Sequence, residues 1–213
     1  MIKANRITDI QFKKNSRKIT IFVDHQPFIE INQDLLLEFS FYIGQVLTQK
    51  KMDDILKKAS LKKAQNYAIK LLSYRARSEF ELSYRLKTKK FHSNIINQVI
   101  DWLKAKNLIN DHEFASLWIK DRLHNKPIGK LKIKKELFQK GIDRDIVEKV
   151  ISSYFSEEQD ELNLAHQLIS DKMKSFQSKK VNYDSKKIIN LLKSRGFSYP
   201  IIKEIYNELT NNP

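Results

Sequence analysis

The sequence predicts a mainly α-helical protein in which three tandem three-helix repeats form an elongated, curved body after a small N-terminal β-meander with short helices. Three observations lead to this fold class. Only 4 Gly and 4 Pro occur in 213 residues, too few for an all-β sandwich, which needs turn residues roughly every 8–12 positions. One apolar spacing occurs three times along the chain. The segment 1–33 differs from the rest in alternating apolar and polar residues.

The N-terminal alternation predicts a two- or three-stranded meander. Apolar residues occupy every second position of 19–23, and polar turn clusters at 15–17 and 24–27 flank this run. This is the pattern of a strand with one buried face. Two or three such strands are marginal in isolation. We therefore expect the meander to pack against helices.

Two further helices are predicted before the repeats begin. Asp34 is a suitable N-cap for a short helix over 35–41, and Gly44 is a suitable stop for it. Thr48 can cap a second helix. A separate, longer helix is predicted over 61–74, the first helix of the first repeat.

The repeat itself is an apolar spacing of 4, 5, 4, 4 and 4 residues, found three times in register. Any one copy is ordinary amphipathic sequence, but three copies with matching residue types indicate a duplicated structural unit. The copies are Leu82, Leu86, Phe91, Ile95, Val99 and Leu103; Ile133, Leu137, Ile142, Ile146, Val150 and Tyr154; and Ile188, Leu192, Phe197, Ile201, Ile205 and Leu209.

The residues that start and stop helices recur with this spacing. Ser78, Gly129 and Asp184 occupy one aligned position and are all acceptable N-caps. Gly141 and Gly196 occupy another, where a helix ends in a left-handed residue. The first copy has Lys90 there, a weaker stop. Asp143 and Ser198 can then cap the next helix, as can His92 or Ser93 in the first copy.

Each repeat therefore contains a longer helix followed by two shorter ones. The longer helices are predicted over 61–74, 112–124 and 157–174, and a long loop is predicted over 174–183. Neighbouring units of this size have thin cores and should share apolar surface. The predicted division is 1–60 for the N-terminal extension, then 61–108, 109–155 and 156–213 for the three repeats.

The charge indicates a polyanionic partner. Forty Lys and Arg against 25 Asp and Glu give a net charge of +15, which points to nucleic acid, a nucleoprotein or an anionic surface. A biased genome composition is an alternative source of part of the lysine excess. No apolar run is long enough to cross a bilayer, and the N-terminus lacks the unbroken apolar stretch that is typical of a signal peptide. The absence of Cys excludes disulfides and thiol catalysis, and fits a cytoplasmic protein.

The basic residues gather in two segments, 62–90 and 120–140. Arg75 and Arg77 precede the Ser78 cap, where free N–H groups and basic side chains can hold a phosphate. The alternative is that these are solvated faces whose lysine stems cover apolar surface. The candidate binding residues are Arg75, Arg77, Arg85, Lys87, Arg122, Lys130, Lys132, Lys134 and Lys135.

Sequence-specific DNA recognition and catalysis are not indicated. In a helix-turn-helix interpretation the last helix of each repeat would read the bases, but these helices carry acidic residues that phosphates would repel: Asp101, Asp145, Glu148, Glu204 and Glu208. The five histidines are scattered, and no nucleotide-binding, metalloprotease or serine-hydrolase motif is present. Helix capping explains the acidic start at 111–113 better than a metal does. We expect no cofactor, no metal and no enzyme activity.

The order and spacing of several short motifs resemble the RecX family, regulators of the RecA recombinase. The resemblance covers about 60–155 well, and the strand-rich start resembles an extension that some members carry. The residues that carry it are Tyr74-Arg75-Ala76-Arg77-Ser78 with Glu81, Leu82 and Leu86; Leu108-Ile109-Asn110-Asp111 with Phe114, Ala115, Trp118 and Arg122; and Gly129, Ile133, Glu136, Leu137 and Lys140-Gly141-Ile142. Lys90, in place of a glycine-like stop, departs from the family pattern.

The resemblance implies a non-enzymatic protein of tandem three-helix repeats that binds RecA–DNA filaments. Family members lower RecA ATP hydrolysis, strand exchange and co-protease activity, and some bind DNA directly. We therefore expect a monomeric regulator of recombination, DNA repair and the SOS response, with the RecA filament and DNA as partners and no membrane. The alternative is a sequence-nonspecific DNA-binding protein without a RecA partner.

Overall fold

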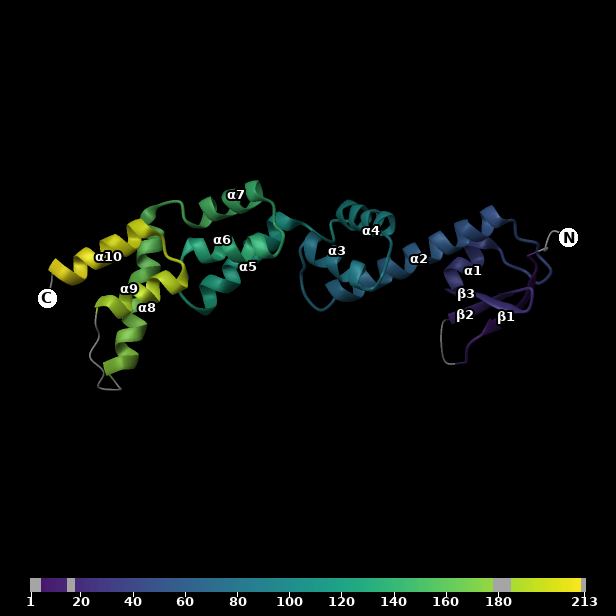
Figure 1. Ribbon diagram of the computed structural model, residues 1–213, viewed down its shortest axis with the longest axis horizontal. Coiled ribbons are helices and arrows are strands. Elements are labelled where there is room, and N and C mark those ends of the chain that lie inside the picture. The colour runs from purple at the N-terminus through teal and green to yellow at the C-terminus, as the bar shows by residue number, and fades with distance from the viewer. Residues whose placement is uncertain (1–4, 15–17, 178–184, 212–213) are drawn as a thin grey trace. The chain divides into compact units, whose positions relative to one another are not determined.

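The computed structural model describes residues 5–14, 18–177 and 185–211. Within these ranges, three strands are followed by ten helices (Figure 1), which confirms the predicted class. Contacts between Cα atoms divide the chain into two compact units, one of Met1–Ser73 with Leu86–Asp101 and one of Tyr74–Arg85 with Trp102–Pro213. The elements are β1 Ile7–Phe12, β2 Lys18–Val23, β3 Gln26–Asn32, α1 Gln33–Phe39, α2 Gln49–Leu72, α3 Glu79–Thr88, α4 Ser93–Ala105, α5 Asp111–Asn125, α6 Lys130–Gln139, α7 Arg144–Tyr154, α8 Glu158–Gln177, α9 Ser185–Arg195 and α10 Tyr199–Asn211.

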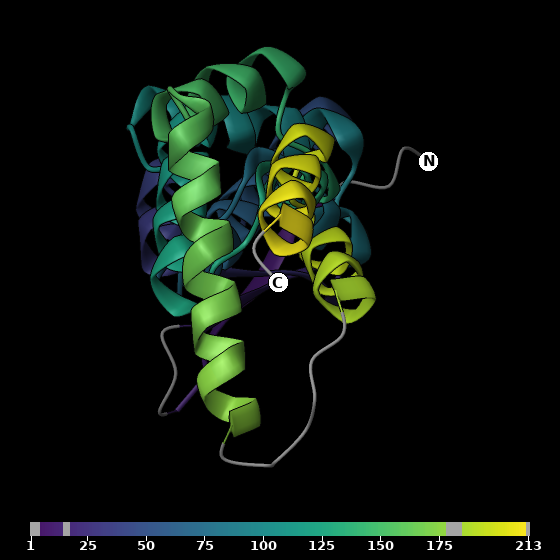
Figure 2. The same cartoon turned by 90° about the vertical axis from the view of Figure 1, so that its left-hand side faces the viewer.

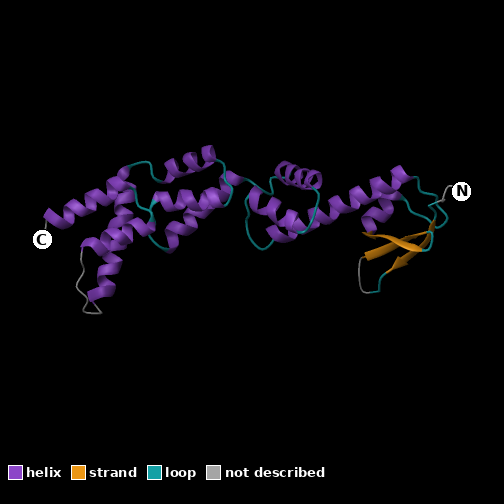
Figure 3. Cartoon of the chain, viewed as in Figure 1, coloured by secondary structure: helices purple, strands orange, loops and turns teal. Residues whose placement is uncertain are grey.

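The first unit contains the predicted meander. Its strands pair antiparallel in the order β1-β2-β3 (Figure 3). Asp24 and His25 connect β2 to β3 with φ of 49° and 65°, the left-handed pair that a two-residue hairpin turn requires. Ile7 and Ile21 are fully buried and belong to one core with Ile55 of α2. The sheet therefore packs against helices, as expected for a sheet this small.

The helix α1 begins and ends at other residues than the sequence indicated. The Asn32 side chain caps it by accepting a hydrogen bond from the Leu35 amide at 3.1 Å, and Asp34 lies inside the first turn. Ser40 ends the helix with φ of 48°, before Gly44 is reached. Asn is as good an N-cap as Asp, so residue preference gives no reason to favour Asp34 over Asn32.

The helix α2 is continuous over Gln49–Leu72, so the prediction of a separate helix at 61–74 is wrong. Thr48 caps it as predicted, accepting from the Lys51 amide at 3.3 Å. Ile55 belongs to the core under the sheet, whereas the buried Ala64 and Ala68 lie outside that core. Nine residues separate Ile55 from Ala64, which is half a turn beyond two full turns. The buried face thus changes side along the helix, and the apolar pattern of this single helix looks like that of two separate helices.

The second unit contains two three-helix clusters. Helices α5, α6 and α7 surround one apolar core, and α8, α9 and α10 surround another. Figure 2 shows the long α8 in green and the shorter α9 and α10 in yellow. Leu164 of α8 packs against both cores, so the clusters share apolar surface as expected for stacked repeats. Every member of the three apolar sets is buried or partly buried. The boundaries proposed at 60, 108 and 155 stay a prediction.

The turn between the two shorter helices is the same in all three copies. Lys90, Gly141 and Gly196 have φ of 63°, 73° and 76°. In each copy the next amide donates to the carbonyl oxygen five residues before it, at 3.3, 3.1 and 3.2 Å, the closing bond of a Schellman motif. Lys90 therefore takes the left-handed conformation in spite of its side chain. Its side chain is exposed, whereas a Cβ at Gly196 would overlap Lys132.

Gly129 is glycine because two backbones meet there. Its amide donates to the Arg195 carbonyl oxygen at 3.0 Å, and the Leu131 amide donates to that of Gly196 at 3.0 Å. A Cβ at Gly129 would overlap the Gly196 carbonyl oxygen and the Phe197 backbone. Gly129 does stand at the N-cap of α6, but glycine has no side chain of its own that could cap the helix. Its role is therefore to bring the second and third repeats together.

Two predicted features reach beyond the described residues. The N-cap assigned to Asp184 lies outside them. The loop expected over 174–183 begins later, because α8 continues to Gln177, and 178–184 are not described.

Asp143 caps α7 as predicted, its side chain accepting from the Asp145 amide at 2.8 Å. Pro200 lies in the first turn of α10, where proline is tolerated.

Candidate polyanion-binding surface

Two candidate residues of the second unit, Arg75 and Arg122, belong to a network of internal ion pairs. Its centre is Glu81 on α3, whose side chain is 14% exposed. Arg75 donates to its two carboxylate oxygens at 2.8 and 3.1 Å, and Lys140 donates at 2.7 Å. Burial by itself raises the pKa of Glu81, but the hydrogen bonds and charges of Arg75 and Lys140 outweigh it and lower the pKa to about 2. Arg75 is thus committed to a structural partner.

The same network continues through Trp118 on α5. The guanidinium of Arg122 and the ammonium of Lys140 each lie 4.7 Å from the centre of its ring, a cation–π arrangement. The indole N–H donates to Glu136 at 3.0 Å, and Arg122 donates to the same oxygen at 2.7 Å. Arg122 and Lys140 are therefore held in place by one aromatic ring and two carboxylates.

The start of α3 is already capped by protein groups. The Ser78 hydroxyl accepts from the Glu81 amide at 3.1 Å and donates to the Lys140 carbonyl oxygen at 2.6 Å. The Glu79 amide donates to the Asp111 carboxylate at 2.9 Å. The pKa of Asp111 is raised, chiefly by burial, although the Glu79 amide opposes this. A phosphate at this helix end would have to displace Ser78 or Asp111.

The start of α6 repeats this arrangement with a buried carboxylate. Glu161 is fully buried and accepts from the Lys130 amide at 3.2 Å and from its ammonium at 3.1 Å. It also accepts from the Ser198 amide at 3.0 Å and hydroxyl at 2.7 Å. Lys130 and Glu79 are equivalent positions of the repeat, so in both copies an acid from the next long helix caps the middle helix. Lys130 is therefore engaged inside the protein.

The remaining candidates divide by exposure. Lys134 pairs with Glu148 at 2.5 Å, and Lys132 donates to the Ser194 carbonyl oxygen at 3.4 Å. Arg77 is half-buried and has an interaction partner of its own. The exposed candidates are Arg85, Lys87 and Lys135. These three are the ones whose charge faces solvent, and they are the better test residues.

Sequence reasoning missed two groups of residues. Lys140 was counted among the basic residues, but its position between Glu81 and Trp118 depends on packing between α3, α5 and α6. The lysines in the first half of α2 fall outside the predicted basic cluster, which begins at Lys62. The signal was present in composition, since α2 carries seven lysines and no arginine.

Comparison with known proteins decides the family. A family model described as RecX, first three-helix domain, matches residues 64–103, and one described as RecX, second three-helix domain, matches 110–151. A protein of Clostridioides difficile (strain 630) named Regulatory protein RecX is 32% identical over 203 residues, 94% of this chain and 93% of that protein. The chain belongs to the RecX family.

Other RecX proteins agree in sequence and in fold. The Regulatory protein RecX of Listeria welshimeri is 31% identical over 97% of this chain and 76% of its own length. A crystal structure of regulatory protein RecX covers 95% of this chain and 98% of its own, with a TM-score of 0.70 and 21% identity. The crystal structure of RecX from Lactobacillus salivarius covers 71% of this chain and 97% of its own chain, with a TM-score of 0.61 and 28% identity. The resemblance seen in the motifs is thereby confirmed.

Within residues 5–14, 18–177 and 185–211, no cluster of three metal-ligating side chains is found. None of the helices in that part of the chain is long and apolar enough to span a membrane. The relatives are named regulatory proteins, and the chain shares their family.

Proposed function

We propose that this protein is a non-enzymatic regulator that binds the RecA–DNA filament and mainly inhibits RecA ATPase, strand exchange and co-protease activity. The observation that carries the proposal is membership of the RecX family over nearly the whole chain. The excess of 40 basic over 25 acidic residues supports a polyanionic partner. The proposal places the protein in the cytoplasm, with roles in recombination, DNA repair and the SOS response.

The repeats suggest how inhibition would work. Stacked helical units of one kind present similar surfaces at regular intervals, which suits a partner that is itself a repeating filament. A protein that contacts neighbouring protomers binds some filament states better than others. It then shifts the filament away from the states that its ATP cycle requires, because a ligand favours the state it binds more tightly.

The proposal is tested by RecA ATPase on single-stranded DNA. We expect inhibition at substoichiometric or near-stoichiometric amounts, with a parallel loss of strand exchange. The proposal is wrong if a saturating excess leaves both activities unchanged. Steep, salt-dependent DNA binding in that case would favour a general DNA-binding protein instead.

The candidate binding residues are tested with charge reversals at exposed positions. The variant R85E/K87E/K135E leaves the Glu81 network intact, whereas reversal of Arg75 would break it. Each lost surface charge contributes about 0.2–1 kcal/mol, so we expect inhibition to be weakened by about threefold to a hundredfold. The matched control is K106E/K149E/K203E, three exposed lysines outside both clusters. Equal effects of the two variants would show that net charge, not these positions, determines binding.

A further inference from the structure

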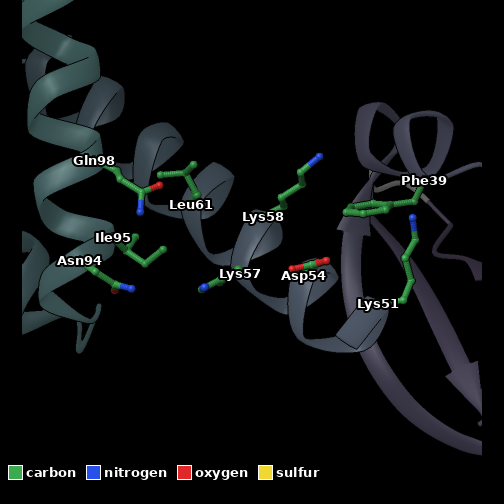
Figure 4. Close-up of a pocket in the computed structure, with 9 residues that line it drawn as sticks. All are labelled: Phe39, Lys51, Asp54, Lys57, Lys58, Leu61, Asn94, Ile95 and Gln98. Carbon is green, nitrogen blue, oxygen red and sulfur yellow. The ribbon is translucent and has the colours of Figure 1, made fainter. Parts of the chain in front are cut away.

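A groove in the first unit lies between α2 and α4, outside the basic clusters considered above. Its volume is about 580 Å³, and it is open to solvent (Figure 4). Three lysines of α2 line one side, and two carboxamides of α4 line the other. The lining residues are Phe39, Lys51, Asp54, Lys57, Lys58, Leu61, Asn94, Ile95 and Gln98.

The groove is a concentration of hydrogen-bond donors with positive charge. Lys57 extends from α2 toward the carboxamides Asn94 and Gln98 (Figure 4). Lys51 and Lys58 lie with their ammonium groups 5.1 Å from the centre of the Phe39 ring. Lys58 also pairs with Glu38 at 2.5 Å, but both side chains are about half exposed, so this pair is weak and a phosphate can displace Glu38. Asp54 is the one acid among the lining residues. The lining side chains therefore carry a net positive charge.

We propose that this groove binds the phosphate backbone of a single strand of nucleic acid. The lysine ammonium is a point charge that can donate to a phosphate in many orientations. A carboxylate is bound better by arginine, whose planar guanidinium donates two parallel hydrogen bonds to it. The helix α2 has seven lysines and no arginine. Asn and Gln side chains are common donors to phosphate and sugar oxygens. An acidic peptide is therefore the less favoured ligand.

The geometry also determines what the groove does not do. The ammonium groups over Phe39 occupy the ring face on which a base would stack, so binding lacks the aromatic platform of many single-strand binding proteins. Contacts to the backbone carry no sequence information. The groove thus binds without sequence preference. The inference rests on the proposed function, because the strand bound in the groove would be the DNA of a RecA filament. Its test uses DNA without RecA.

The experiment measures binding of the full chain to fluorescein-labelled oligothymidylate by anisotropy between 50 and 200 mM salt. The groove variant is K51Q/K57Q/K58Q. The matched control is K50Q/K63Q/K70Q, which removes the same charge from the same helix at exposed positions outside the groove. Three lost phosphate contacts lower the salt slope by about 2 for a single strand. Over this salt range the wild type should lose about 20-fold more affinity than the groove variant, and the control should follow the wild type.

A second variant tests the opposite wall without changing charge. N94A/Q98A should weaken binding several-fold at every salt concentration and leave the slope unchanged. Circular dichroism checks that each variant keeps its helix content. Equal slopes for the two lysine variants would overturn the proposal. So would a groove variant that binds oligothymidylate like the wild type and loses binding to poly-L-glutamate, because the ligand would then be an acidic protein.

The outcomes separate this inference from the proposed function. Loss of DNA binding in the groove variant, with wild-type protein that does not inhibit RecA, would uphold the groove and reject the regulator. Inhibition of RecA by the wild type, with unchanged DNA binding by the groove variant, would do the reverse.

Discussion

Replacing Glu81 by Gln should destabilise the second unit in a manner that depends on pH. The substitution keeps the size of the side chain but removes the charge that accepts from Arg75 and Lys140. Because the folded state lowers the pKa of Glu81 from 4.5 to about 2, the carboxylate stabilises the fold above its unfolded pKa. That contribution is lost as the pH falls from about 4.5 toward 2.

The magnitude follows from the same pKa values. A difference of about 2.5 units corresponds to at most about 3.4 kcal/mol. The Arg75 side chain is 46% exposed, so solvent screens its charge. We therefore expect a loss of about 1–2 kcal/mol at pH 7 and less than half of that at pH 3. Trp118 shares Lys140 with Glu81, so its fluorescence reports on the same region.

The assay is urea unfolding followed by Trp118 fluorescence in a W102F background, at pH 7, 5 and 3. The control is E204Q, which changes an exposed glutamate on α10. We expect E81Q to lower the midpoint at pH 7 and the control to leave it unchanged. A midpoint difference that is the same at pH 7 and pH 3 would refute the assignment of a strongly lowered pKa.

The remaining predictions concern the repeated turns and the buried acid. G196A should lower the free energy of unfolding by about 2 kcal/mol or more, because a Cβ there is strained at φ of 76° and overlaps Lys132; thermal unfolding would contradict this if the midpoint stayed the same. K90G should instead stabilise the protein by about 0.5–1 kcal/mol, because Lys90 holds a left-handed conformation at an exposed site; an unchanged or lower midpoint would count against it. E161A should cost about 3–5 kcal/mol, because it leaves Lys130 and Ser198 without their buried partner; a loss below about 1 kcal/mol in urea unfolding would show that water replaces the carboxylate.

Much of the fold could be predicted because local patterns repeat. The apolar spacing identified residues that are all buried or partly buried, and the period-two alternation identified the sheet. Helix boundaries were less secure where two good caps are close together, as at Asn32 and Asp34. The break placed at 61 was wrong because α2 changes its buried face partway along. A local pattern cannot distinguish this from two helices.

The candidate site was predictable only as composition. Clusters of Lys and Arg are visible in the chain, but whether each charge faces solvent depends on partners far away in sequence. Lys140 meets Glu81 across 59 residues and Lys130 meets Glu161 across 31. In the sequence, the exposed residues Arg85, Lys87 and Lys135 cannot be told apart from the paired Lys130 and Lys140 by their charge. Their different roles follow from which carboxylate lies within reach.

The sequence alone determined the repeat, the helical class, the positions of the turns inside the repeats and the excess of positive charge, since each depends on residue type at short spacing. The tertiary structure decided why Gly129 is glycine, since that depends on the backbone of Gly196 meeting it. It also decided that Lys90 can stand where the other copies have glycine, since its side chain is exposed. Contacts between distant segments set steric room and local charge, and neither quantity is a property of neighbouring residues in the chain.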